Sequence, residues 1–127
     1  MRRFRHLRVV RDGGPRGWLE HAGAERSIVA LRGEWDASNC DRSRELLDGV
    51  AGWSQIVVID LSQVTFADST VLALVVAAQS NQRAAGGTLR VVVASEAVDH
   101  LLDQTGLRDE LDLYASREDA LHLREPA

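Results

Sequence analysis

Three consecutive polar residues, Asp68, Ser69 and Thr70, form the part of this sequence best suited to chemistry. They follow a β-branched run at residues 56–59 and precede a stretch that is apolar at helical spacing. Side-chain oxygens of Asp, Ser and Thr cap helices by accepting bonds from free backbone N–H groups. We therefore expect Ser69 at the start of a helix, where the partial positive charge of the N-terminus tolerates a phosphate.

Other kinds of chemistry find little support in the sequence. A Ser-His-Asp triad built on Ser69 lacks the G-x-S-x-G turn, because the local run is ADSTV. The four histidines are scattered, and neither H-x-x-x-H nor C-x-x-C spacing occurs, so we predict no metal site. All fifteen basic residues are arginine, which excludes a P-loop lysine and a lysine nucleophile. We predict a protein with no catalytic residues and no cofactor.

Strands and helices that alternate along the chain would position these residues. The predicted strands cover residues 18–21, 27–31, 56–59, 88–94 and 111–114, and the predicted helices begin near residues 39, 70, 95 and 116. The third strand ends at Asp60, Ser38 and Ser95 are plausible caps of the helices that follow them, and Gly106 ends the helix after Ser95. This alternation indicates an α/β sandwich with a mainly parallel sheet. Asp36, Asp60 and Asp68 each follow a predicted strand and could converge at one edge. Carboxylates there can bind magnesium, but they more often cap helices and turns, which we favour for Asp60.

The helix that begins after Asp68 has two contrasting faces. At 100° per residue, one face gathers larger apolar residues that should press on the sheet, namely Val71, Leu74, Val75 and Ala78. The second face, which we call the small-residue stripe, consists of Ser69, Ala73, Ala77, Ser80 and Ala84. This stripe is either an ordinary exposed surface or a docking surface on which another protein's backbone can come close. The pattern alone leaves both interpretations open.

Composition limits the classes of function. A chain of 127 residues is about one domain, and its net charge of −4 argues against direct nucleic-acid binding. The longest apolar run, residues 71–78, is far short of the ~20 residues that a membrane span needs. A single cysteine, Cys40, excludes a disulfide framework and favours a reducing compartment.

The N-terminal residues 1–16 form a basic arm or an extra strand, with arginines at positions 2, 3, 5, 8, 11 and 16. We favour solvated arginines at a chain terminus. The alternative is contact with an acidic partner or an anionic lipid surface.

Three motifs give the chain a resemblance to a known family. They are RGEWD at 32–36, VVIDLSQVTFADST at 57–70 and LLDQTGL at 101–107. In this order they resemble the STAS domain family, to which the bacterial anti-sigma factor antagonists belong, over about residues 18–114. The resemblance implies a STAS domain at 17–127. It also implies a mixed, mainly parallel sheet of four or five strands, with about four helices packed mainly on one side.

The resemblance also implies a function. In the family, an anti-sigma factor that is also a serine kinase phosphorylates the serine of the D-S-x motif, which is Ser69 here, with Thr70 as the alternative acceptor. The expected partner-binding residues are Asp36, Asp68, Ser69, Thr70, Ala73, Ala77 and Ser80. The implied protein is a cytoplasmic bacterial anti-sigma factor antagonist that regulates transcription by partner switching. It is not an enzyme, and a weak homodimer is left open.

One departure from the family pattern keeps a second interpretation open. The family usually has glycine two residues after the phosphorylated serine, where this chain has Val71. A branched side chain there alters how closely a partner can approach. The alternative function is an unphosphorylated STAS subunit of a signalling scaffold or of a lipid ABC transporter, in which Ser69 only caps a helix. A third interpretation, a small-molecule or nucleotide sensor, has no dedicated pocket motif in the sequence.

Overall fold

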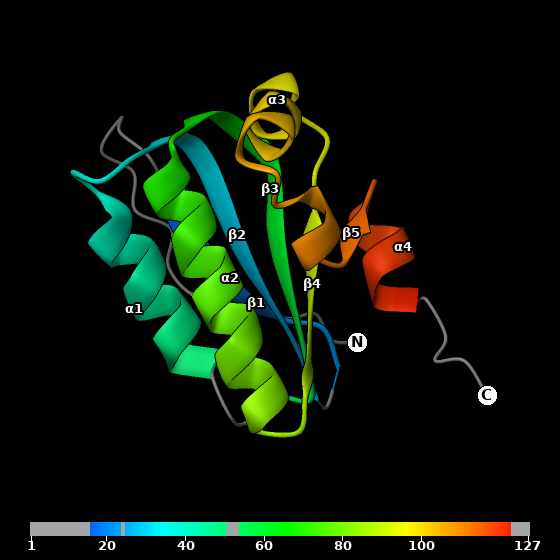
Figure 1. Cartoon of the computed structure of the whole chain (residues 1–127). Coiled ribbons are helices and arrows are strands. Elements are labelled where there is room, and N and C mark those ends of the chain that lie inside the picture. Colours follow the sequence, from blue (N-terminus) through cyan, green and yellow to red (C-terminus); the bar gives the residue numbers. More distant parts are fainter. Residues whose placement is uncertain (1–15, 24, 51–53, 123–127) are drawn as a thin grey trace.

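A five-stranded mixed sheet forms the centre of the protein in this computed structural model, which describes residues 16–23, 25–50 and 54–122 (Figure 1). The strands are β1 (Arg16–His21), β2 (Arg26–Trp35), β3 (Ile56–Ala67), β4 (Thr88–Val92) and β5 (Leu113–Tyr114). The helices are α1 (Cys40–Val50), α2 (Ser69–Ala84), α3 (Glu96–Thr105) and α4 (Arg117–His122), with a 3-10 turn at Arg108–Glu110. The spatial order of the strands follows the sequence.

The sheet is mixed but mainly parallel, which confirms the prediction. β1 pairs with β2 antiparallel, and the β2–β3, β3–β4 and β4–β5 pairs are parallel. The predicted arm at 1–16 overlaps the described chain only at Arg16, which begins β1. The rest of that arm lies outside the described residues.

Helices cover the two faces of the sheet unequally, as expected (Figure 1). The larger core joins α1, α2 and α3 to one face, with Ile59 of β3, Val75 of α2 and Leu102 of α3 all buried in it. The smaller core lies on the far face, where Ala120 of α4 packs with Val58 of β3. Successive residues of β3 therefore point into different cores, which explains why its first half is apolar throughout.

β2 and β3 run further than the sequence indicates. The prediction that the strand from Ile56 ends at Asp60 is wrong, because β3 continues to Ala67 alongside β2. From Ala30 to Trp35 on β2, the paired segment of β3 runs from Asp60 to Ala67 with two register shifts. These shifts are β-bulges, which add unpaired residues to one strand and break its alternation of faces. A pattern search for period-two alternation therefore loses this strand after Asp60.

Three arginines hold α4 on the far face. Arg26 and Arg90 donate from Nη1 to the carbonyl oxygens of Leu121 and Ala120 at 3.0 and 2.7 Å. The third, Arg117, lies in α4 itself and bonds carboxylates of the sheet. Cations suit these positions because carbonyls at the end of a helix lack intrahelical donors.

Arg117 pairs with two carboxylates of the sheet. Its Nε donates to the buried Asp60, and its two Nη groups donate to Glu20 at 3.0 and 3.1 Å. Burial opposes the charge of Arg117, but the bonds to Glu20 and Asp60 outweigh it, so its pKa is raised. Asp60 therefore belongs to a structural ion pair, where the sequence favoured a cap of a helix or turn over a magnesium site shared with Asp36 and Asp68.

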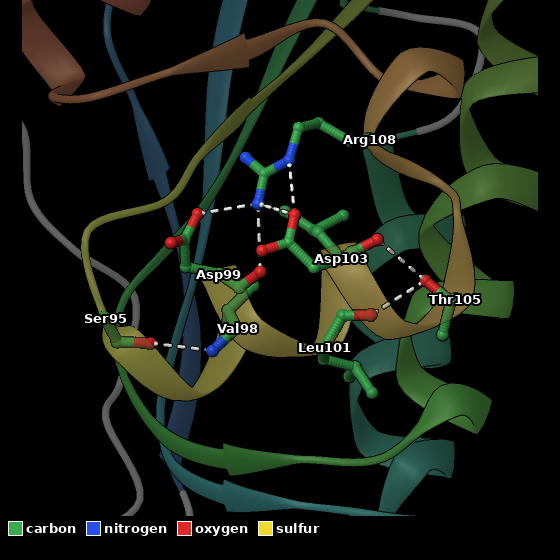
Figure 2. Close-up of polar contacts among 8 residues, drawn as sticks. Ser95, Val98, Asp99, Leu101, Asp103, Thr105 and Arg108 are labelled. Atoms are coloured by element: carbon green, nitrogen blue, oxygen red, sulfur yellow. Dashed lines mark hydrogen bonds and ion pairs between the residues drawn. The ribbon is translucent and has the colours of Figure 1, made fainter.

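α3 begins and ends as predicted. Ser95 caps it by accepting a bond from a backbone N–H in the first turn, and Gly106 ends it in the left-handed conformation at φ 74°. Figure 2 shows Arg108 bonded to the carboxylates of Asp99 and Asp103, each at 2.8 Å. The side-chain bonds to these acids raise the pKa of Arg108. They fasten the 3-10 turn to α3.

Replacing Arg117 with Met should lower the free energy of unfolding by about 2–3 kcal/mol, because the buried Asp60 carboxylate loses its charged partner. The loss should fall below that of a fully buried pair, since 34% of the Arg117 side chain is exposed. Urea denaturation measures the change.

Two variants make this test specific. Adding Asp60→Asn to Arg117→Met should recover part of the loss, because the unpaired charge is removed. Arg44→Met should cost less than about 0.5 kcal/mol, because Arg44 pairs with Asp41 on the exposed surface. Equal losses for Arg44→Met and Arg117→Met would contradict the assigned role of Arg117.

Candidate functional site

The start of α2 presents a serine hydroxyl to solvent, as the sequence predicts. Ser69 is the first residue of α2 and is exposed. Asp68 is the N-cap, with an extended backbone at φ −108°, and its Oδ1 accepts a bond from the Thr70 N–H at 3.0 Å. Because Asp68 caps the helix, the hydroxyl of Ser69 is not required for capping.

The same Asp68 carboxylate also holds the loop between β2 and α1. Its Oδ2 accepts a bond from the backbone N–H of Ala37 at 3.3 Å, while its own N–H donates to the carbonyl of Trp35 at 3.3 Å. One residue thus joins the end of β2, the following loop and the first turn of α2. These bonds hold the R-G-E-W-D segment close to Ser69.

Asp36 orders that loop from within. Its Oδ1 accepts bonds from the Ser38 hydroxyl at 2.6 Å and from the Ser38 N–H at 2.9 Å, and its own N–H donates to Asn39. The bonds from the Ser38 side chain and then its backbone lower the pKa of Asp36. The prediction that Ser38 caps α1 is wrong, because α1 begins at Cys40 and the Ser38 hydroxyl donates to Asp36.

A buried tryptophan supports the loop from the core side. Trp35 ends β2 and is 1% exposed, and its indole Nε1–H donates to the carbonyl of Arg32 at 3.0 Å. Gly33, between them, has φ 95°, a conformation that side chains with a Cβ rarely adopt. The R-G-E-W-D segment therefore requires glycine for its backbone and tryptophan for its packing.

The small-residue stripe is exposed along its whole length, from Ser69 through Ala73, Ala77 and Ser80 to Ala84. Among the expected partner-binding residues, Asp36, Asp68 and Thr70 are half-buried around the start of this stripe. The structure thus brings the predicted set together on one end and one side of α2.

The face of α2 that packs on the sheet differs partly from the prediction. Val71 and Val75 are buried as expected, but Leu72 is buried too. Gln79 and Gln82 are also buried, where their amides donate to the carbonyls of Glu110 and Ser54 at 2.7 and 2.6 Å. The sequence did not predict that these glutamines are buried, because a search for apolar periodicity ignores polar side chains that form hydrogen bonds in the interior.

Val71, which stands where the family usually has glycine, does not alter the exposed surface. Val71 is 1% exposed and its side chain belongs to the core beneath α2. The branched side chain therefore points away from Ser69 and from the small-residue stripe. A partner that approaches the stripe meets the same short side chains that it would meet with glycine at this position.

Three further features of the described chain bear on its possible chemistry. Within residues 16–23, 25–50 and 54–122, no group of three His, Cys, Asp or Glu side chains could hold a metal ion. No helix in those ranges is long and apolar enough to cross a bilayer. An open groove of about 790 Å³ lies between β3 and α3, lined by polar and acidic residues such as Ser62, Glu96 and Asp103.

Residues 20–120 match the model of the STAS domain family. The chain belongs to this family. The STAS domain is 33% identical over 90 residues to the anti-sigma-B factor antagonist of Bacillus subtilis, covering 71% of this chain and 83% of that protein.

Solved structures share the fold of this STAS domain. An anti-sigma factor antagonist from Mycobacterium paratuberculosis superposes with a TM-score of 0.70 at 26% identity, covering 94% of this chain and 92% of that one. The Bacillus cell fate determinant SpoIIAA in its phosphorylated form superposes with a TM-score of 0.65 at 19% identity, covering 85% of this chain and 99% of that one. The predicted family and fold are thereby confirmed.

Removing the hydroxyl of Ser38 should raise the pKa of Asp36. In the wild type, the bonds that lower this pKa stabilise the loop at neutral pH, and that contribution is lost as the pH falls through the lowered pKa. An NMR titration of the Asp36 carboxyl carbon in wild type and Ser38→Ala measures the difference. Identical titration midpoints would show that the Ser38 hydroxyl does not interact with Asp36 in solution.

Asp68→Ala should destabilise the domain by about 1–2 kcal/mol, because α2 loses its N-cap and the loop loses its anchor. Amide hydrogen exchange should accelerate most at Thr70 and Ala37, the two donors to Asp68. Asp41→Ala, which removes an exposed acid from the first turn of α1, is the control and should leave both amides unchanged. Unchanged exchange at Ala37 in Asp68→Ala would contradict the link between helix and loop.

Proposed function

We propose that this protein is an anti-sigma factor antagonist whose binding to a kinase-type anti-sigma factor is controlled by phosphorylation of Ser69. The observation that carries the proposal is the exposed Ser69 hydroxyl at the first turn of α2, directly above an exposed stripe of small side chains. Anti-sigma factor antagonists among its relatives, one of them solved in a phosphorylated form, support the proposal.

In the unphosphorylated state, α2 docks on the anti-sigma factor through its stripe and thereby releases the sigma factor. Ala73, Ala77 and Ser80 present at most a methyl or hydroxyl group, so a partner helix can pack close to the α2 backbone. Such close packing allows many van der Waals contacts over a small area. The same closeness makes the contact sensitive to any group added at Ser69.

Phosphorylation would turn this contact off through charge and volume. A phosphoserine adds about −1.5 to −2 charges and three acceptor oxygens. The positive end of the α2 dipole and the surrounding water stabilise a phosphate in the isolated protein, but an apolar partner surface cannot replace the water that the phosphate loses. A loss of about 3–4 kcal/mol in binding free energy corresponds to a several-hundred-fold weaker complex.

The antagonist supplies only the acceptor in the phosphorylation step. The Ser69 oxygen forms a bond to the terminal phosphorus of ATP held by the partner, the bond to the leaving ADP breaks, and the hydroxyl proton is released. Thr70 is a less accessible acceptor, because it is half-buried in the first turn. We propose that the protein acts in the bacterial cytoplasm, without contacting nucleic acid, as a monomer or weak homodimer.

The alternative role as an unphosphorylated STAS subunit rested on the residue at position 71. That side chain lies in the core and leaves the Ser69 surface unaltered. No observation on the described surface therefore favours the alternative over partner switching.

Ser69→Asp should weaken binding to a kinase-type anti-sigma factor of the same bacterium by at least about 100-fold, while Ser69→Ala should bind like the wild type. Isothermal titration calorimetry measures both affinities. Gln104→Glu adds the same charge at an exposed position of α3 and should bind normally. Equal affinity for wild type and Ser69→Asp would overturn the proposal.

Incubation with that kinase and ATP should phosphorylate the wild type at one site and leave Ser69→Ala unmodified. Intact-mass spectrometry counts the phosphates added, and tandem mass spectrometry of tryptic peptides assigns the site. Full phosphorylation of Ser69→Ala would move the acceptor to Thr70 or to another hydroxyl.

A further inference from the structure

Phe66 is the one large apolar side chain that the described part of the chain leaves exposed. It lies three residues before Ser69, near the end of β3, and 48% of its surface is open to solvent. Aromatic residues contribute to folding chiefly by leaving water, so an exposed Phe gives up much of that contribution. Exposed aromatic residues next to polar ones are typical of protein interfaces.

A β-bulge is what turns Phe66 outward. Val64 is buried and pairs with Gly33, but the next partner of β2, Glu34, pairs with Phe66. Thr65 is therefore an extra residue in β3. In a regular strand Phe66 would share the buried face of Val64, because side chains two residues apart point the same way; the bulge at Thr65 breaks this alternation.

The bulge also constrains which residue can stand opposite it on β2. Gly33 adopts a positive φ of 95° at the register shift, so β2 needs glycine beside the bulge. Beyond the shift, Ala67 is buried opposite Trp35, which leads the chain inward just before the N-cap Asp68. The same local device thus exposes an aromatic ring and places the cap of α2.

We infer that Phe66 is an anchor that inserts into an apolar pocket of the kinase-type anti-sigma factor when that partner covers Ser69. This inference rests on the proposed function. A standard interface buries about 800 Å² on each partner, which is wide enough to include a residue three positions from Ser69. Beside this pocket, a basic side chain of the partner would pair with the exposed Glu34, which stands directly across from Phe66.

Phe66 should contribute to the affinity for the partner and not to the rate of phosphate transfer. Phe66 has no group that accepts or donates a proton. Its truncation should therefore weaken binding of the partner and leave the reactivity of the Ser69 hydroxyl unchanged. In kinase assays, this distinction appears as a raised KM for the antagonist with an unchanged maximal rate.

Phe66→Ala should weaken binding to the anti-sigma factor about 10- to 100-fold in calorimetry, with a similar rise in KM for phosphorylation of Ser69. Phe66→Leu keeps an apolar side chain and should stay within about fivefold of the wild type. Gln63→Ala truncates an exposed side chain of the same strand and should leave both values unchanged. Glu34→Lys should slow association and reduce its dependence on salt.

Urea denaturation of the full chain separates this inference from its competitors. For an anchor, Phe66→Ala should weaken binding and should lower the unfolding midpoint only slightly, because about half of the side chain is already exposed. A lowered midpoint with unchanged affinity would mean that Phe66 packs against this chain itself, and loss of a dimer in sedimentation with unchanged affinity would mean that it packs against a second copy. Either result overturns the anchor. If both Phe66→Ala and Ser69→Asp bind the anti-sigma factor normally, the anchor and the proposed function are both wrong. If Ser69→Asp binds weakly and Phe66→Ala binds normally, only the anchor is wrong.

Discussion

The Asp68 carboxylate, shared between two backbone segments, is the interaction on which the functional end of this STAS domain depends. One oxygen caps α2 through Thr70 and the other holds the β2–α1 loop through Ala37. Because both bonds come from one side chain, the serine that follows it has a fixed position relative to the loop. The cap thus frees Ser69 from a structural role and leaves its hydroxyl available for modification.

Two bulges in β3 explain how a buried strand can lead into this exposed end. The sheet keeps regular pairing through Asp60, and the extra residues beyond it rotate β3 against a regularly alternating β2. The strand can therefore bury Leu61, Val64 and Ala67 in turn and still present Phe66 to solvent. The predicted partner-binding residues gather where this irregular segment meets the first turn of α2.

Much of this arrangement could be predicted from local signals. The apolar runs, the cap at Asp68 and the stripe of α2 each depend on neighbouring residues, so the mainly parallel sheet, the exposed Ser69 and the exposed small-residue stripe were accessible from the sequence. The bulges were not, because they depend on how two strands pair. Nor was the role of Asp60, whose partner Arg117 lies 57 positions away. Ser38 was assigned the wrong role because Asp36 competes for its hydroxyl.

The attachment of α4 has a consequence for the local stability of the fold. A helix of six residues is not stable alone in water, so α4 depends on the bonds of Arg26, Arg90 and Arg117 and on the burial of Ala120. Detaching it breaks several charge-assisted bonds at once. Local opening of α4 should therefore be rarer than the fraying of a short helix that lacks such bonds.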